Sequence, residues 1–225
     1  MLENIDLTDP YISRFFHQKD VYTLHLIYDL PEAWWSRPYE YEWCKNFISK
    51  YDCVLDAACG IPHPLKFYLA NHSAEVFACD ADPRIASAEQ IYEEIRSDIG
   101  EEACKLIEQL DTSNLYLEQG NIAALSYADE TFDKILCISV LEHMNLPDQL
   151  CAMQEFHRTL KKQGTLLITL DYPTVDLTHF INICLSSGFT FAKEPDCRVP
   201  IEALHTDLYG GLYCFRAVLL KIMNL

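Results

Sequence analysis

The stretch Val54-Leu55-Asp56-Ala57-Ala58-Cys59-Gly60 decides the fold of this chain. It is a short apolar run that ends in an acidic residue and then a glycine, which is typical of a buried strand turning sharply toward a ligand. A second run, residues 75–80, ends on Asp80, twenty residues after Gly60. In a strand–helix–strand unit, this spacing places a glycine under a nucleoside and a carboxylate at its ribose hydroxyls.

The residues after Gly60 indicate which nucleoside the unit binds. A dinucleotide site has the pattern G-x-G-x-x-G, whose later glycines allow backbone N–H groups to bind a pyrophosphate. Here Gly60 is followed by Ile61-Pro62-His63-Pro64, and the next glycine is Gly100. The two prolines have no N–H to donate, and the sequence has no G-x-x-x-x-G-K-[ST] loop. The pattern therefore predicts a nucleoside without phosphates, and S-adenosylmethionine is the one that fits.

Three later segments carry a resemblance to a known family. They are Gln119-Gly120-Asn121-Ile122 with Phe132-Asp133 after it, residues 138–143 with the sequence ISVLEH, and residues 160–168 with the sequence LKKQGTLLI. In this order and spacing, the chain resembles the class I S-adenosylmethionine-dependent methyltransferases over residues 50–172. The resemblance implies S-adenosyl-L-methionine as the cofactor and a methyl acceptor as the second substrate.

The fold class that the resemblance implies is α/β. It is a three-layer, Rossmann-like methyltransferase fold with a seven-stranded, mostly parallel sheet and an antiparallel last strand. The pattern itself alternates strands and helices from residue 51 onward, which favours a sheet covered on both faces. Apolar stripes predict helices over residues 85–99, 150–160 and 176–187. We expect strands at residues 53–57, 75–80, 114–118, 133–139, 165–170, 189–193 and 212–222.

Residues 1–50 stand outside this alternation. They are rich in Phe, Tyr and Trp and are interrupted by Pro10, Pro31 and Pro38. We expect an N-terminal helical cap segment over residues 1–50 and an S-adenosylmethionine-binding methyltransferase domain over residues 51–225. The aromatic residues suit a cap over the active site and a brace packed against the sheet equally well, so both interpretations stay open.

The resemblance also implies roles for individual residues. Asp80 would accept hydrogen bonds from both ribose hydroxyls, and Gly60 would let the chain pass close under the methionine part of the cofactor. Asp56 would support the ammonium end. Asn121 stands where relatives often have Asp, and its amide oxygen can still accept from the adenine amino group. The complete predicted cofactor-binding set is Asp56, Ala58, Gly60, Asp80, Ala81, Asn121, Ile122 and Ser139.

Methyl transfer needs an acceptor held in line with the methyl group in a dry pocket, and a base where the acceptor must lose a proton. The resemblance implies that His143 lies just past the fourth strand beside the active-site mouth, and it is the predicted catalytic residue; the other interpretation is a polar residue bonded within its loop. Residues 194–211 lack periodicity, and Gly210-Gly211 would suit a hinge. We expect this segment and the N-terminal cap to enclose the acceptor, unless it forms an extra helix.

Composition limits the partners. There are 34 acidic and 17 basic residues, for a formal net charge of −17, so we expect a small-molecule acceptor and no nucleic acid. No apolar run reaches membrane length, and residues 1–6 have neither a basic nor an apolar segment of signal length. We therefore expect a cytoplasmic protein without a membrane partner. The ten cysteines lack metal-ligand spacing, so no metal is expected. The oligomeric state and the acceptor's identity stay open.

The predicted function is thus S-adenosylmethionine-dependent methyl transfer to an oxygen, nitrogen or carbon nucleophile of a small molecule. One alternative is a catalytically silent module that binds S-adenosylmethionine. Another is an NAD(P)-dependent oxidoreductase on a similar fold, which Pro62 and the missing second and third glycines disfavour. A protein substrate is also compatible with the sequence.

Overall fold

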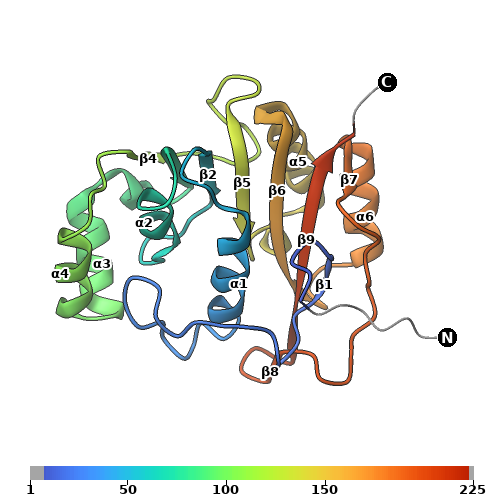
Figure 1. The fold of residues 1–225 in the computed structure, drawn as a ribbon, viewed down its shortest axis with the longest axis horizontal. Helices are drawn as coiled ribbons and strands as arrows, with labels where there is room; N and C mark the ends of the chain where they lie inside the picture. Colours follow the sequence, from blue (N-terminus) through green and yellow to red (C-terminus); the bar gives the residue numbers. More distant parts are fainter. Residues whose placement is uncertain (1–7, 223–225) are drawn as a thin grey trace.

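One sheet forms the centre of this computed structural model, which describes residues 8–222. Its strands follow the order β1-β9-β6-β5-β2-β3-β4, and β7 and β8 also pair with β9 (Figure 1). Strands β2 to β6 run parallel, and β9 is antiparallel to β6. The strands are β1 (Arg14–Phe15), β2 (Cys53–Ala57), β3 (Glu75–Asp80), β4 (Leu115–Gln119), β5 (Phe132–Ile138), β6 (Leu160–Tyr172), β7 (Phe189–Phe191), β8 (His205–Thr206) and β9 (Leu212–Lys221).

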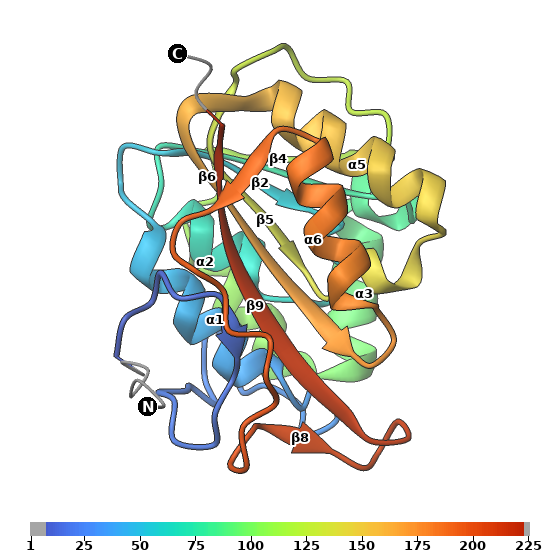
Figure 2. The same cartoon turned by 90° about the vertical axis from the view of Figure 1, so that its right-hand side faces the viewer.

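The sheet confirms the mostly parallel arrangement with an antiparallel last strand. The sequence predicted seven strands, and the structure adds β1 and β8, of two residues each. Along β9, residues 219–221 pair with β7, residues 215–216 with β1 and residues 212–213 with β8 (Figure 2). The three short strands therefore cover the edge of β9 that β6 leaves open. A two-residue strand has no alternation of its own, so the sequence pattern could not reveal it.

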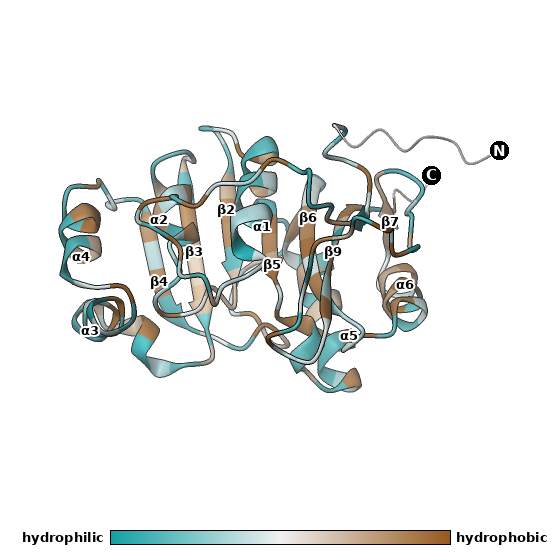
Figure 3. Cartoon of the chain, turned by 90° about the horizontal axis from the view of Figure 1, so that it is seen from below, coloured by the Kyte–Doolittle hydropathy of each residue, from teal (hydrophilic) through white to brown (hydrophobic). Residues whose placement is uncertain are grey.

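Helices cover both faces of the sheet, with α1 and α2 on one face and α5 and α6 on the other (Figure 3). Neighbouring residues of β2 point to opposite faces. Val54 packs with Leu65 and Leu69 of α2, whereas Leu55 packs with Phe156 of α5. The helices are α1 (Arg37–Cys44), α2 (Leu65–Ala70), α3 (Ala88–Asp98), α4 (Glu101–Glu108), α5 (Leu146–Thr159) and α6 (Leu177–Ser186), and the 3-10 helices are η1 (Lys45–Phe47), η2 (Pro83–Ala86) and η3 (Leu141–His143).

The helix predicted over residues 85–99 is divided in the structure. Ser87 adopts an extended conformation between η2 and α3, and its side chain accepts a hydrogen bond from the backbone N–H of Gln90 at 3.3 Å. Gly100, with a φ of 118°, separates α3 from α4. Ile85 and Ile95 are nonetheless buried in one cluster, so the apolar stripe is continuous in space although the helix is not. An apolar stripe reports the buried face and not the breaks in hydrogen bonding.

The described part of the N-terminal segment combines the two roles left open by the sequence. Phe15, Phe16 and Trp43 are buried against the sheet, so this part acts as a brace. Trp34 and Trp35 are half-buried and line a cavity, which is the position that a cap requires. Helical structure between residues 8 and 50 comprises α1 and η1, with turns, bridges and β1 before them. Residues 1–7 of the predicted segment lie outside the described residues.

Candidate active site

Two adjoining cavities lie where the parallel strands end, the edge at which open α/β sheets bind ligands. The smaller has a volume of about 120 Å³ and lies against the loop that follows β2. Four residues of the predicted cofactor set line it. They are Asp56, Ala58, Gly60 and Ser139. Ala58 and Ser139 have positive φ values of 56° and 49°, so the chain turns sharply at the ends of β2 and β5.

Asp56 is a buried carboxyl group with unused hydrogen-bonding capacity. It is 2% exposed, and its Oδ2 has no hydrogen-bond partner among the described residues. Burial raises the pKa of Asp56 to about 7, although the Lys66 ammonium opposes this shift. A buried acceptor without a partner is costly, and a ligand that donates to it removes the cost. The ammonium end of S-adenosylmethionine is such a donor, so this residue fits the predicted cofactor.

Lys66 shapes the loop that replaces the usual glycine-rich turn. Its buried Nζ donates to the carbonyl oxygens of Gly60 at 2.7 Å, Ile61 at 2.9 Å and His63 at 2.7 Å. Burial lowers the pKa of the Lys66 ammonium, while Cys59 and Asp56 oppose the shift. Lys66 of α2 therefore supplies the hydrogen-bond donor for these three loop carbonyls. The loop itself offers no row of N–H groups to a pyrophosphate.

Gly60 is required by its conformation and by a neighbour. Its φ is 64°, and a Cβ at this position would lie 2.4 Å from Cδ2 of His63. The sequence predicts a close approach of the cofactor at Gly60, and within the structure the His63 ring is the neighbour that a Cβ would meet. Gly60 also donates its N–H to Oδ2 of Asp80 at 2.8 Å. The glycine thus links the loop after β2 to the end of β3.

Asp80 lies at the carboxyl end of β3, as the sequence predicted. Its second carboxylate oxygen accepts the N–H of Asp82 at 2.9 Å. Each carboxylate oxygen has two lone pairs, so the group keeps capacity for two further donors, as two ribose hydroxyls require. The structure therefore leaves Asp80 oriented by backbone N–H groups and still able to bind a ligand.

The other predicted cofactor residues lie at neighbouring strand ends. Ala81 is exposed next to Asp80, and Ile122 is buried after β4. The side-chain oxygen of Asn121 accepts the N–H of Ala123 at 2.9 Å, which forms a local turn. The hydroxyl of Ser139 donates to Oε1 of Glu40 at 2.7 Å. Asn121 and Ser139 thus have protein partners that the sequence did not reveal.

Glu40 anchors the N-terminal segment to this edge of the sheet. It is completely buried, and its Oε1 accepts from the hydroxyls of Ser139 at 2.7 Å and Thr169 at 2.5 Å. Oε2 accepts from Ser36 at 3.0 Å and forms an ion pair with Arg37. Burial alone would raise the pKa of Glu40, but Arg37 and the hydroxyl donors outweigh it and lower the pKa. A buried carboxylate with this many donors is ionised and fixed in place.

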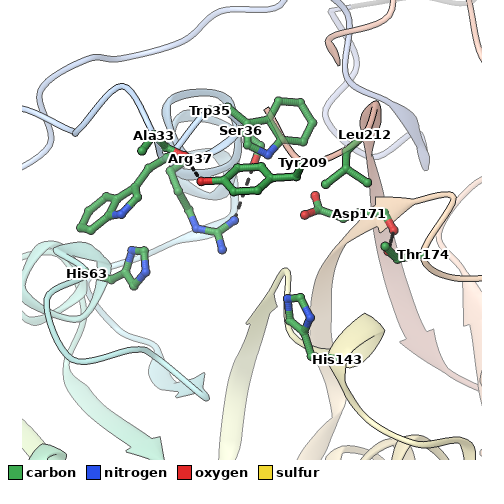
Figure 4. A pocket seen from close by; sticks show the side chains of 11 residues that line it. Ala33, Trp35, Ser36, Arg37, His63, His143, Asp171, Thr174, Tyr209 and Leu212 are labelled. Carbon is green, nitrogen blue, oxygen red and sulfur yellow. Dashed lines mark hydrogen bonds between the residues drawn. The ribbon is translucent and has the colours of Figure 1, made fainter. Parts of the chain in front are cut away.

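The larger cavity has a volume of about 400 Å³ and faces the N-terminal segment and the loop before β9 (Figure 4). Arg37 and His63 line both cavities. Figure 4 shows the Arg37 guanidinium pointing into the space between His63 and His143. The remaining lining residues are Ala33, Trp34, Trp35, Ser36, Asp171, Thr174, Tyr209 and Leu212. A pocket of this size with aromatic walls and a few polar groups is typical of a small-molecule site.

Two carboxyl groups lie close together beside the larger cavity. Asp171, near the end of β6, lines the cavity, and its Oδ1 is buried without a hydrogen-bond partner among the described residues. Oε1 of Glu142 accepts the backbone N–H of Asp171 at 2.9 Å. Burial raises the pKa of Asp171 to about 6 and that of Glu142 to about 8. Perturbed carboxyl groups in a cavity are typical of functional sites.

The two histidines of the cavity differ in their surroundings. His143, the predicted catalytic residue, is exposed at the end of η3 and lines the cavity. His63 stacks on Trp34 with a ring-centroid distance of 4.1 Å, and its Nδ1 lies 2.8 Å from the hydroxyl of Tyr41. Burial, then the charges of Arg37 and Lys66, hold the pKa of His63 well below its usual value. His63 is therefore neutral and fixed, whereas His143 is exposed at the edge of the cavity.

Sequence reasoning missed several residues of the site, and two of them carried a usable signal. Asp171 follows an apolar strand in the same way as Asp56 and Asp80, so the strand-end rule that found those residues could have found it. Arg37 lies in a block of aromatic residues that the sequence argument left between two interpretations. Lys66 carried no signal, because a lysine on a short helix is ordinarily exposed.

Comparison with known proteins agrees with this site. Residues 55–168 match the family model described as a methyltransferase domain. This match spans half of the chain and includes the loop after β2, the end of β3 and η3. The chain belongs to the methyltransferase domain family. Membership implies S-adenosylmethionine as the cofactor, in agreement with the residues at the smaller cavity.

Individual relatives of this methyltransferase domain protein match over part of their length. A demethylmenaquinone methyltransferase of Alkalihalophilus pseudofirmus is 32% identical over 105 residues, which are 44% of this chain and 42% of that protein. An uncharacterized protein of Methanocaldococcus jannaschii is 46% identical over 50 residues, which are 22% of this chain and 21% of that protein. The matched stretches therefore span less than half of these curated relatives.

Solved structures share the fold at low sequence identity. A TehB-like SAM-dependent methyltransferase from Corynebacterium glutamicum has a TM-score of 0.56 at 16% identity and covers 81% of this chain and 86% of its own. A SAM-dependent methyltransferase from Methanosarcina mazei has the same TM-score and identity and covers 80% of this chain and 97% of its own. At this identity, the likeness confirms the Rossmann-like architecture.

Among residues 8–222, no three His, Cys, Asp or Glu side chains are grouped so as to hold a metal ion. The helices in this part of the chain are all too short or too polar to cross a membrane.

Proposed function

We propose that this protein transfers a methyl group from S-adenosylmethionine to a small-molecule nucleophile. The observation that carries the proposal is the adjacency of the two cavities. The smaller is lined by four of the eight predicted cofactor residues, Asp56, Ala58, Gly60 and Ser139, and the larger, of about 400 Å³, opens beside it. Arg37 and His63 line both cavities, so the two cavities adjoin at these residues.

Four of the predicted cofactor residues have a stated role in this proposal. Asp80 would bind the ribose hydroxyls, Asp56 the ammonium group, and the residues around Asn121 and Ile122 the adenine ring. Arg37 would bind the carboxylate with the donors that face the cavities and are not used by Glu40. When bound, the cofactor supplies a methyl group that is already activated by the sulfonium charge.

The protein's own part is to position the acceptor and to exclude water. Trp34 and Trp35 approach the larger cavity from the N-terminal segment, and Tyr209 and Leu212 approach it from the loop before β9 and from β9 itself (Figure 4). The hydroxyl of Tyr209 donates to the carbonyl of Ala33 at 3.4 Å, so the two walls touch. These contacts support the expectation that both segments enclose the acceptor.

The proposal is tested by following a tritiated methyl group from S-adenosylmethionine into a cell extract divided by ultrafiltration. We expect label in the small-molecule fraction with the native protein, and at least tenfold less with Asp80→Ala, as the loss of a charge-assisted hydrogen-bonded pair predicts (about 1.5–3 kcal/mol). Label in the protein or nucleic-acid fraction would contradict a small-molecule acceptor. Binding of the cofactor without any transfer would indicate a silent module.

A further inference from the structure

The charges of the larger cavity indicate which acceptor it binds; this inference rests on the proposed function. Two charged groups line the cavity, Arg37 and Asp171. Arg37 is paired with Glu40, which is buried and accepts from three hydroxyls besides. The arginine charge is thus balanced inside the protein. The negative charge of Asp171 has no ion-pair partner among the described residues.

Asp171 differs from Arg37 in its electrostatic surroundings. Within residues 8–222, no lysine, arginine or histidine forms an ion pair with it, and its Oδ1 is buried without a hydrogen-bond donor. The carboxyl group nevertheless faces the cavity across from Arg37 (Figure 4). Burial first, and the Glu40 charge second, raise the pKa of Asp171 to about 6, while Arg37 opposes the shift. Among the described residues, Arg37 thus acts on Asp171 only through its charge, and none donates a hydrogen bond to Oδ1 of Asp171.

The walls of the cavity suit a cation as well. Trp34 lines the same cavity as Asp171, as do Trp35 and Tyr209 (Figure 4). Aromatic faces attract ammonium groups and also bind the apolar body of an amine. The net charge of −17 attracts cations to the molecule as a whole and repels anions.

We propose that the methyl acceptor is a primary or secondary amine whose ammonium group binds the carboxylate of Asp171 between these aromatic walls. The ammonium gives one proton to Asp171, which becomes a carboxylic acid. The neutral nitrogen then forms a bond to the methyl carbon as the bond from that carbon to sulfur breaks, with its electron pair kept by sulfur. The product is a methylated ammonium ion, and Asp171 later releases its proton to water.

An anionic acceptor fits the same site poorly. It would place a second negative charge in the cavity with Asp171, while its only cationic partner, Arg37, already serves Glu40 and faces the cofactor cavity. A neutral alcohol would leave the Asp171 charge without compensation. Asp171 suits the removal of a proton from the acceptor better than His143 does, because a carboxylate also attracts the ammonium group that it deprotonates.

The test measures binding to the full chain saturated with S-adenosylhomocysteine, so that no turnover occurs. Calorimetry first records S-adenosylhomocysteine binding to the native protein, to Asp171→Asn and to the control Asp98→Asn, an exposed carboxylate at the end of α3. Ligand-observed NMR then compares matched arylalkyl triplets, such as 2-phenylethylamine, 2-phenylethanol and phenylacetate. Asp171→Asn changes the same charge as the control, but inside the cavity.

We expect the amines to bind at least about tenfold tighter than their alcohol and carboxylate partners. Asp171→Asn should abolish this preference without changing S-adenosylhomocysteine affinity, and Asp98→Asn should keep both. If S-adenosylhomocysteine binds but no amine binds, or alcohols or carboxylates bind equally well, the amine proposal is wrong while the proposed function stands. If S-adenosylhomocysteine itself fails to bind, both fail. Should Asp171→Asn not fold, the preference of the native protein still decides.

Discussion

Asp56 shows how a single residue can be unfavourable for folding and useful for binding. Its carboxyl group is buried, lacks a partner on Oδ2 and has a pKa of about 7. Natural proteins keep such groups where a ligand compensates them, because stability and activity compete at these positions. A ligand with an ammonium group at the smaller cavity would lower this pKa and stabilise the folded chain at the same time.

The pH dependence of stability follows from this raised pKa. The ordinary pKa of an aspartate side chain is about 3.8. Between that value and about 7, the folded protein binds a proton at Asp56 that the unfolded chain has lost. The free energy of unfolding therefore falls as the pH rises through this window. Asp171 and Glu142, whose pKa values are also raised, act in the same direction.

We predict that Asp56→Asn makes the free protein's stability less dependent on pH. Urea unfolding from pH 5 to pH 8 should show a loss of stability for the native protein, of up to about 1.4 kcal/mol per pH unit for each such group. The slope should be smaller for Asp56→Asn and unchanged for the exposed control Asp98→Asn. An identical slope in all three proteins would show that Asp56 is already ionised in the folded state.

At the scale of elements, α2 and the loop before it form one unit. The Lys66 ammonium of α2 binds three loop carbonyls, and the Gly60 N–H binds the carboxylate at the end of β3. The loop is therefore held from both sides in the absence of a ligand. This network stands where a dinucleotide site has its second and third glycines. The loop carbonyls accept from Lys66, and the two prolines have no N–H to donate to a phosphate.

We predict that Lys66→Met destabilises the protein by about 2–4 kcal/mol, since three carbonyl groups of the loop, including that of the buried Ile61, lose their donor. It should also weaken S-adenosylmethionine binding, because the loop would no longer be held in the binding conformation. Urea unfolding and calorimetry measure the two effects. Lys162→Met, a change at an exposed lysine of β6, is the matched control. Native stability and affinity in Lys66→Met would mean that the backbone alone fixes this loop.

The elements also show which features a sequence reveals. The strand ends at Asp56 and Asp80 were predicted because a buried run followed by an acid is a local pattern. The start of the helix predicted over residues 85–99 was wrong, because Ser87 interrupts the hydrogen bonds but not the apolar stripe, whereas its predicted end before Gly100 agrees with α3 to within one residue. Local patterns report burial, and capping contacts decide where a helix stops.

At the scale of the whole molecule, contacts between distant segments complete the site. Glu40 of α1 binds Ser139 after β5 and Thr169 of β6, at separations of 99 and 129 residues. Tyr209 reaches the carbonyl of Ala33 across 176 residues. No local pattern encodes such contacts, so the sequence predicted a cavity between these segments with His143 beside it, but it did not reveal Arg37 or Asp171. Asp56, Ala58 and Gly60 could be placed together from the sequence because they lie in one continuous strand–helix–strand unit.

The measurement that tests the central claim most directly is S-adenosylmethionine binding by calorimetry, on the native chain and on Asp80→Ala. We predict binding in the micromolar range by the native protein. The substitution should weaken it by about 1.5–3 kcal/mol, which is the contribution of a charge-assisted pair of hydrogen bonds. Absence of binding by the native chain, or equal affinity of the two proteins, would contradict the assignment of the β2 loop and Asp80 as the cofactor site.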